Sequence, residues 1–173
     1  MVLNKIVHPA VRWEMYRALL KNYIRGSWAV VLDIPLLFES RLDFMCGTVM
    51  VVSVSDPKIQ MERLRARDPH LSSEDAANRV RSQVDIREKA AKAEFRGTWN
   101  RGVVVQNDGD KDQLRDEVSR AVKVISRGSP SWWGWILVLA PPLAVGVALW
   151  NVLVNLRLRK RWERREREEK AKL

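Results

Sequence analysis

The stretch AVVLDIPLLFESRLDFMCGTVMVVSV, residues 29–54, decides the fold class of this chain. It contains two short apolar runs, residues 29–34 (AVVLDI) and residues 48–54 (TVMVVSV). Such runs are typical of strands that are buried on both faces of a parallel sheet. A third run of this kind covers residues 103–106. We therefore predict three strands of one sheet.

Helical patterns lie around these runs. The first recurs in steps of three and four residues and ends at Gly26. Another begins with Asp56 and Pro57, which are favoured at the N-cap and at the first helical position. Apolar strands that alternate with helices predict an α/β fold with a mainly parallel sheet. The expected helices cover residues 4–25, 56–67, a segment opened by Ser72, 86–95 and 110–126.

The charge of the chain is strongly basic. Its 173 residues carry a formal net charge of +10, and the tail, residues 157–173, alone contains nine Lys/Arg and four Glu. A basic body suits an anionic ligand such as a nucleotide, and charge alone would equally suit nucleic acid. The Arg/Glu mixture of the tail favours a solvated helix, so we expect no nucleic-acid partner. The single cysteine, Cys46, excludes an internal disulfide and fits a reducing compartment.

Residues 132–156 form a stretch without any charge. As a helix this segment would be about 37 Å long, enough to cross a hydrocarbon core of about 30 Å. Tryptophans lie near both of its ends, as is typical of membrane–water interfaces. We predict a membrane segment here and a membrane-associated protein whose other part lies in the cytosol. The alternative is a buried core helix.

Two prolines, Pro141 and Pro142, lie in the middle of this segment. They predict either a kinked span or a hairpin that enters and leaves on one side. The basic tail favours a cytosolic C-terminus, whereas a short tail after a lone span would suit a tail anchor across the membrane. Both topologies stay open. The predicted domain organisation is therefore residues 1–126, a linker at 127–131, the membrane segment at 132–156 and a charged tail at 157–173.

Four motifs occur in an order that resembles the dephospho-CoA kinase family. They are LNKIVHPAVR (residues 3–12), VVLDIPLLFES (residues 30–40), QMERLRARD (residues 60–68, with Ser82-Gln83 and Glu88-Lys89 after it) and QNDGD (residues 106–110). The resemblance implies a P-loop-kinase-like parallel sheet with flanking helices. It also implies transfer of the ATP γ-phosphoryl group to the 3′-hydroxyl of dephospho-CoA, with Mg²⁺ bridging the phosphates.

The resemblance also implies roles for individual residues. Arg63 and Arg67 lie four apart on one helix face and would clamp ATP phosphates as lid arginines. Asp33 would lie near the acceptor ribose or the metal, with His8 and Arg12 on the same acceptor side. Asn107 and Gly109 would shape the turn near the adenine. Weaker candidates, or matches without a derived role, are Arg65, Arg79, Gln83 and Lys89, and Glu39 is expected to start a helix.

One part of the family pattern is missing. None of the eight glycines precedes a lysine, so the chain lacks the loop G-x-x-x-x-G-K-[ST] that cradles the donor phosphates. The sheet then lacks its first strand, expected between residues 29–34 and 48–54. The chain also carries Ala93-Glu94 for the family's Ala-Asp, followed by an extra segment at residues 96–102. We therefore expect a fragment, partial gene model or splice form that is inactive alone. The alternative is a non-catalytic, membrane-tethered interaction module.

Overall fold

The structure is a computed structural model that describes residues 2–70, 72, 74–76, 78, 86–128 and 130–172, with side chains from Pro9 onward. It divides into two compact units, each described here by itself. Unit 1 comprises Met1–Leu36 and Ser129–Trp150, and unit 2 comprises Leu37–Gly128 and Asn151–Leu173. The boundary between the units falls inside the last helix, so it differs from the domain limits expected from the sequence, which remain a prediction.

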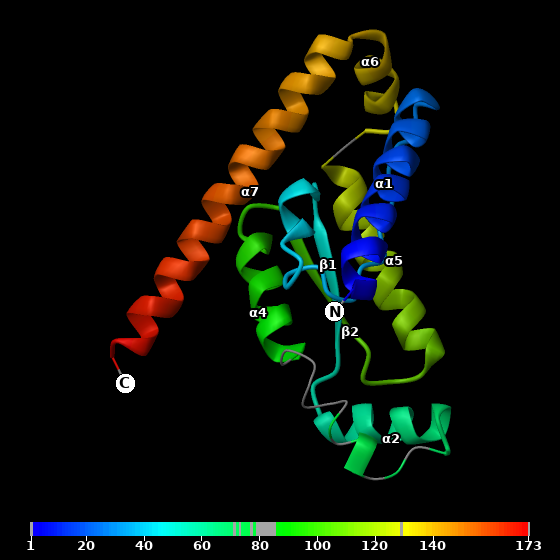
Figure 1. Ribbon diagram of the computed structural model, residues 1–173, viewed down its shortest axis with the longest axis vertical. Coiled ribbons are helices and arrows are strands. Elements are labelled where there is room, and N and C mark those ends of the chain that lie inside the picture. Colours follow the sequence, from blue (N-terminus) through cyan, green and yellow to red (C-terminus); the bar gives the residue numbers. More distant parts are fainter. Residues whose placement is uncertain are drawn as a thin grey trace. The chain divides into compact units, whose positions relative to one another are not determined.

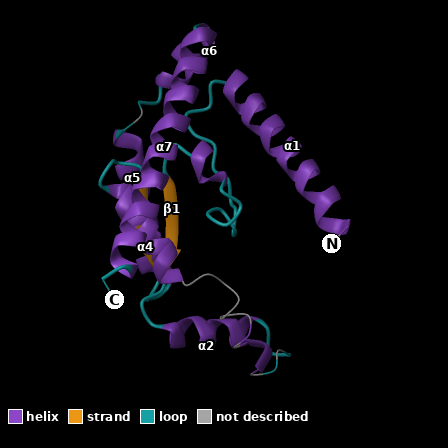
Figure 2. Ribbon diagram, turned by 60° about the vertical axis from the view of Figure 1, so that its left-hand side comes forward, coloured by secondary structure: helices purple, strands orange, loops and turns teal. Residues whose placement is uncertain are grey.

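The centre of unit 2 is a parallel sheet. Strand β1 (Val49–Ser53) pairs with β2 (Gly102–Gln106), with Val49 opposite Gly102 and Ser53 opposite Gln106. These are the only strands among the described residues, and they are drawn in orange in Figure 2. Two of the three predicted strands are thereby confirmed.

Two helices cover this sheet. Helix α4 (Ile86–Gly97) packs against both strands and α5 (Lys111–Arg127) packs against β2, on either side of the strands in Figure 1. The core between them is made of small side chains, with Val105 and Ala93 fully buried. A Cβ atom on Gly102 would lie 1.9 Å from the Ala93 carbonyl oxygen. Glycine at this position therefore permits the close contact of α4 and β2.

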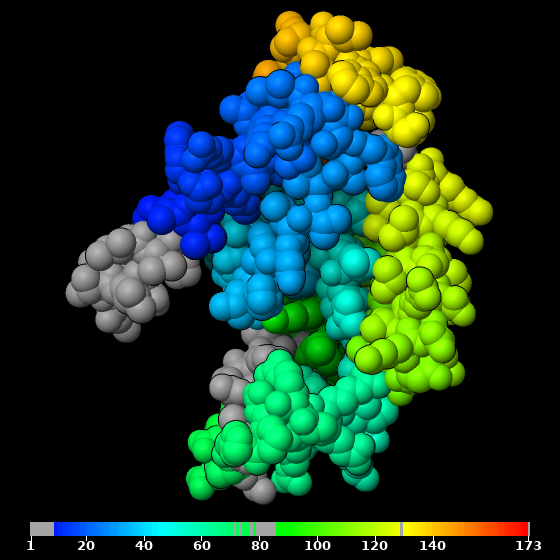
Figure 3. All heavy atoms as spheres, turned by 90° about the vertical axis from the view of Figure 1, so that its right-hand side faces the viewer, coloured from blue at the N-terminus to red at the C-terminus, as the bar shows by residue number. Residues whose placement is uncertain are grey.

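Helix α5 exposes its outer side to solvent. The atoms of this helix are the yellow-green ones along the right-hand side of Figure 3, and its Val122 and Val124 are 45% and 54% exposed. The helix begins at the predicted place because Asp110 caps it: its carboxylate accepts hydrogen bonds from the backbone N–H groups of Asp112 and Gln113.

Helix α2 (Pro57–Arg67) also begins as predicted. The Asp56 carboxylate accepts from the Lys58 N–H at 2.8 Å, and Pro57 occupies the first helical position. Farther along, the Ser72 hydroxyl accepts from the Asp75 N–H at 3.0 Å, which confirms the expected cap. Part of the segment that follows lies outside the described residues, including Arg79, Ser82 and Gln83.

The predicted strand at residues 29–34 is wrong. These residues have no strand pairing, and Val31 is 85% exposed. An apolar run becomes a strand only where a neighbour satisfies its N–H and C=O groups. No described segment pairs with this run, so its composition alone does not make it a strand.

Unit 1 contains helix α1 (Val2–Ile24), as predicted, and the short helix α6 (Trp133–Leu139). The Tyr23 hydroxyl donates to the Leu137 carbonyl oxygen at 2.7 Å. Gly26 follows α1 with φ of +65°, and a Cβ atom there would lie 2.7 Å from the Trp135 ring. Both the backbone conformation and the close approach of the indole thus require glycine.

The predicted membrane segment is interrupted where the prolines occur. Helix α6 ends at Leu139, Ala140 is non-helical, and helix α7 (Pro141–Lys170) starts with proline at its first position. Among the described residues α7 is the one helix long and apolar enough to cross a membrane, judged by length and composition alone. Whether residues 132–156 span a membrane or form a hairpin stays a prediction.

Candidate functional site

The loop that follows β2 is attached to the end of β1. Because the strands are parallel, both end at the same edge of the sheet, where ligands of α/β proteins bind. The Asn107 N–H donates to the Ser53 carbonyl oxygen at 2.8 Å. The loop 107–109 is therefore fixed beside the start of α2.

Arg63 of α2 braces this loop. Its Nη1 donates to the Asn107 carbonyl oxygen at 2.6 Å and its Nη2 to the Gly109 carbonyl oxygen at 2.8 Å. Three residues that the sequence assigned to nucleotide binding are thus brought together. Their contacts differ from the expected ones, because two donors of the Arg63 guanidinium hold backbone oxygens of the loop.

Arg67 lies apart from this arrangement. Its Nη2 donates to the neighbouring Asp68 carboxylate at 3.0 Å, and this hydrogen bond raises the pKa of the guanidinium. Its side chain is 71% exposed. Arg63 therefore braces the loop, whereas Arg67 on the same helix is presented to solvent.

Sequence reasoning missed Ser55 and Asp108. The Asp108 carboxylate accepts from the Ser55 hydroxyl at 2.6 Å and from the Ser55 N–H at 2.7 Å. These two hydrogen bonds, the hydroxyl first, hold the pKa of Asp108 below its usual value. Asp108 lies inside the QNDGD motif between two residues that were singled out, and that position was the available signal.

Two matches to the family pattern form an ion pair. Lys89 Nζ lies 2.8 Å from the Glu39 carboxylate, and both side chains are partly buried. Burial acts to raise the pKa of Glu39, but the hydrogen bond and charge of Lys89 outweigh it, so the pKa lies below the usual value. No helix starts at Glu39, since residues 35–41 form turns. The expectation of a helix-start role is therefore wrong.

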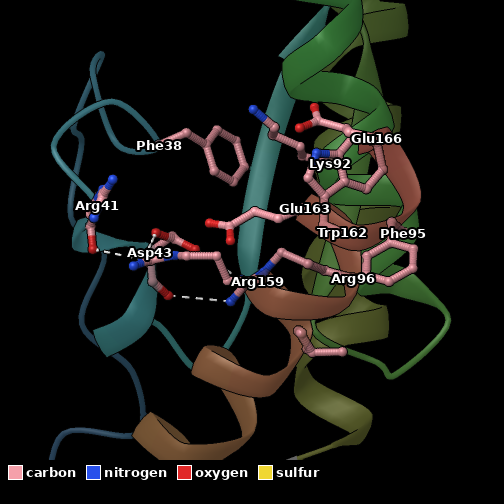
Figure 4. A pocket seen from close by; sticks show the side chains of 11 residues that line it. Phe38, Arg41, Asp43, Lys92, Phe95, Arg96, Arg159, Trp162, Glu163 and Glu166 are labelled. Atoms are coloured by element: carbon pink, nitrogen blue, oxygen red, sulfur yellow. Dashed lines mark hydrogen bonds and ion pairs between the residues drawn. The ribbon is translucent and has the colours of Figure 1, made fainter. Parts of the chain in front are cut away.

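A buried charged cluster lies nearby in unit 2. Arg96 Nη1 donates to the Asp43 carboxylate at 3.1 Å, and both residues are only 4% exposed. Arg159 of α7 donates to the other carboxylate oxygen at 2.5 Å. Figure 4 shows these groups at one end of an open pocket of about 200 Å³, whose wall includes Phe38 and Trp162.

The residues predicted on the acceptor side belong to unit 1. Arg12 lies on α1 and Asp33 in the segment after it, and both are exposed. Residues 29–34 form no strand, so the expectation that Asp33 lies at the end of a strand is wrong. The His8 side chain lies outside the described residues. Among the described residues no three His, Cys, Asp or Glu side chains form a group that could hold a metal ion.

Comparison with known proteins identifies the family of the chain. The dephospho-CoA kinase profile matches residues 1–113. The dephospho-CoA kinase of Saccharomyces cerevisiae is 35% identical over 158 residues, which are 91% of this chain and 61% of the yeast protein. The dephospho-CoA kinase of Bacillus cereus ATCC 10987 is 47% identical over 121 residues, 70% of this chain and 56% of its own.

An uncharacterized protein of Schizosaccharomyces pombe is 39% identical over 145 residues, 83% of this chain and 56% of its own. The chain thus spans little more than half the length of these curated relatives. No solved structure matches it. The order of the four motifs, the α/β fold and the match of the family profile over residues 1–113 agree, and the chain belongs to the dephospho-CoA kinase family.

Proposed function

We propose that this chain is part of a dephospho-CoA kinase-type phosphotransferase. In the proposed reaction, the 3′-hydroxyl oxygen of dephospho-CoA forms a bond to the γ-phosphorus of ATP. The bond from that phosphorus to the β–γ bridging oxygen breaks, ADP leaves, and the hydroxyl proton is released. The observation that carries the proposal is the loop 107–109, braced by Arg63 at the carboxyl edge of the sheet in a chain of this family.

Each candidate residue has a distinct role in this proposal. Arg63 keeps the loop of Asn107 and Gly109 in place beside the base of the nucleotide. Arg67 is exposed on α2 and presents its guanidinium to phosphate oxygens, whose geometry it matches bidentately. His8, Arg12 and Asp33 face the acceptor. Phosphoryl transfer depends mainly on positioning the substrates and neutralising their charge. Residues that form no covalent bond to the substrates can therefore contribute to catalysis in these ways.

ATP is the proposed donor, and Mg²⁺ normally accompanies it in this chemistry. The described residues contain no group of three His, Cys, Asp or Glu side chains that could hold the ion. The chain also contains no glycine followed by lysine, and so no donor-phosphate loop of the usual pattern. We therefore propose that the 173-residue chain binds its ligands without turnover.

A second proposal concerns attachment to a membrane. Most of the apolar window of α7 is exposed, only 11% of it being buried. In unit 1, Leu139 is 82% exposed and Trp150 is 59% exposed. A bilayer would cover such surface, and aromatic residues near its ends favour the interface. The proposed protein is thus membrane-associated, with the kinase part in the cytosol. A non-catalytic, membrane-tethered module remains the alternative function.

An activity assay tests the first proposal. The chain and a version extended upstream by a strand and a G-x-x-x-x-G-K-[ST] loop would be incubated with ATP and dephospho-CoA, and CoA would be quantified. We expect turnover from the extended version alone, and Arg67→Met should lower it while Lys58→Met, another exposed cation of α2, should not. A folded but inactive extended version would refute the enzyme proposal and leave the tethered module.

A further inference from the structure

Three polar residues recur at four-residue steps along α7. Asn151, Asn155 and Arg159 therefore lie on one face of the helix. Asn155 is completely buried, although it lies within the stretch that the sequence assigned to a membrane. A buried amide in the middle of an apolar helix is costly unless its hydrogen bonds are satisfied.

All three residues donate to backbone carbonyl oxygens of one short segment, residues 41–46, and Arg159 also donates to the Asp43 carboxylate within it. Asn151 Nδ2 donates to Met45 at 3.2 Å. Asn155 Nδ2 donates to Phe44 at 2.9 Å and to Cys46 at 2.8 Å. Arg159 Nη2 donates to Arg41 at 3.1 Å. Helix α7 thus fixes the main chain of this segment at several successive points.

The acceptors of the same face are satisfied by arginines from the region of α4 and β2. Arg96 Nη2 donates to Asn155 Oδ1 at 2.7 Å, and Arg101 donates to Asn151 Oδ1. Arg96 also pairs with Asp43, which lies within the segment 41–46. Asn155 is therefore a bridge whose donors hold the segment and whose acceptor holds α4.

The segment 41–46 directly continues the DIPLLFES motif. The Arg41 N–H donates to Phe38 at 3.2 Å and the Leu42 N–H donates to Leu37 at 3.1 Å, so the two stretches are joined backbone to backbone. Phe38 faces the same pocket as Trp162 of α7 (Figure 4). A displacement of the segment would therefore displace the second half of the motif.

We propose that Asn155 and Arg159 are positioning residues that hold the DIPLLFES motif for the acceptor. The C-terminal half of α7 then contributes to acceptor binding by the kinase unit. The claim that the motif binds the acceptor rests on the proposed function. The claim that α7 holds segment 41–46 in place does not rest on it, so each claim can be refuted without the other.

The test uses the full chain with four single substitutions in α7. Asn155→Asp keeps the shape and the acceptor but removes both donors. Arg159→Met removes the contacts to the Arg41 carbonyl oxygen and to the Asp43 carboxylate. Arg157→Met is the matched control, since Arg157 is exposed on the same helix. Arg159→Lys is the conservative variant, to be used also if Arg159→Met fails to fold. Calorimetry would give the Kd for dephospho-CoA and for ATP, and hydrogen exchange would follow the amides of Arg41, Leu42 and Cys46.

We expect Asn155→Asp and Arg159→Met to raise the Kd for dephospho-CoA by about tenfold, because misplacing a binding group weakens binding without abolishing it. The Kd for ATP should change by less than about twofold, a difference smaller than one kT in free energy. Exchange at the three amides should accelerate, and amides of β2 should not change. Arg159→Lys should restore part of the affinity, and Arg157→Met should behave as the unaltered chain.

Two results would overturn the inference. If the three amides exchange at unchanged rates, α7 does not hold the segment, whatever the affinities do. If both affinities fall together with the melting temperature, the residues are merely structural. Absence of all binding by the unaltered chain would instead count against the proposed function. Hydrogen exchange would then still decide whether α7 holds segment 41–46.

Discussion

Arg63 and Gly109 are 46 residues apart in sequence, yet Nη2 of the arginine donates to the carbonyl oxygen of the glycine at 2.8 Å. The contact joins α2 to the loop that follows β2. It also uses a donor that the sequence assigned to a phosphate. A guanidinium that donates to backbone oxygens fixes the conformation of the loop. It therefore affects a ligand indirectly, through the position of that loop.

Replacing Arg63 with Met should therefore loosen the loop 107–109. Two hydrogen bonds from a charged donor are lost at an exposed site, so we expect a destabilisation of about 1 kcal/mol. The Kd for ATP should rise about tenfold or more, as expected when a preorganised site loses its support. Urea denaturation and calorimetry measure the two effects. Lys58→Met is the control, and equal effects from it would contradict the bracing role.

The Asp108–Ser55 contact predicts a dependence of stability on pH. Because the folded state lowers the pKa of Asp108 from about 3.8, its contribution is complete above that value and is lost as pH falls through the lower folded pKa. The difference in melting temperature between the unaltered chain and Asp108→Asn should be constant near neutral pH. It should shrink only below about pH 4, since the unfolded carboxyl titrates there. A difference that instead grew toward acid pH would contradict the assignment.

The buried pair of Arg96 and Asp43 predicts a large stability effect. Arg96→Met leaves the buried Asp43 carboxylate paired with Arg159 and removes the donor to Asn155. Losing one partner of a buried pair costs about 3 to 5 kcal/mol. Arg120→Met removes an exposed pair with Glu117 and should cost below about 1 kcal/mol. Chemical denaturation of both variants gives the comparison, and similar costs would argue against burial as the cause.

Cys46 provides a chemical probe of the same region. Burial raises the pKa of this thiol. The charge of Arg96 opposes this shift, and the smaller influence of Asp43 adds to it. The thiolate is the reactive form, so alkylation of the folded chain at neutral pH should be slow. Reaction with iodoacetamide followed by mass spectrometry measures the rate, with the urea-unfolded chain as reference. Equal rates in the two states would show that Cys46 is not protected.

Membrane attachment predicts co-flotation of the chain with phospholipid vesicles. Leu139→Glu combined with Leu149→Glu should weaken this binding, because a charge at the centre of a membrane helix costs about 2.5 to 3.5 kcal/mol. Val31→Glu adds a charge at an exposed apolar site of unit 1 outside the segment and should have little effect. If all the variants float equally, the segment 132–150 does not carry the attachment.

The sequence predicted those elements whose signals are local. Asp56 with Pro57, and Asp110, mark helix starts through side-chain caps, and both were placed correctly. The strand at residues 29–34 failed because pairing is a property of the neighbouring chain and not of composition. Composition was also misleading for residues 151–156. They carry no charge and were assigned to the membrane segment, but Asn155 is buried and hydrogen-bonded to other parts of the chain. The Asn-x-x-x-Asn-x-x-x-Arg spacing was the signal for it.

For the site, the sequence found the participants but not their contacts. Asn107, Gly109 and Arg63 were chosen from motifs, and the structure joins them through backbone oxygens that no motif displays. Lys89 and Glu39 matched the family pattern separately, while their pairing depends on the packing of α4. Hydrogen bonds to the main chain and pairs across elements are set by tertiary geometry, which residue identity alone does not encode.

Asn151, Asn155 and Arg159 can bind segment 41–46 together only if they lie on the same face of α7. Inserting one residue between Asn151 and Arg159 would rotate the downstream part of the helix by about 100° and turn Arg159 away from Arg41. Inserting seven residues would come within about 20° of restoring its direction, but would move it along the axis by about 10 Å. We expect relatives that keep these contacts to preserve the eight-residue spacing between Asn151 and Arg159. The length of the apolar stretch before Asn151 should vary among them.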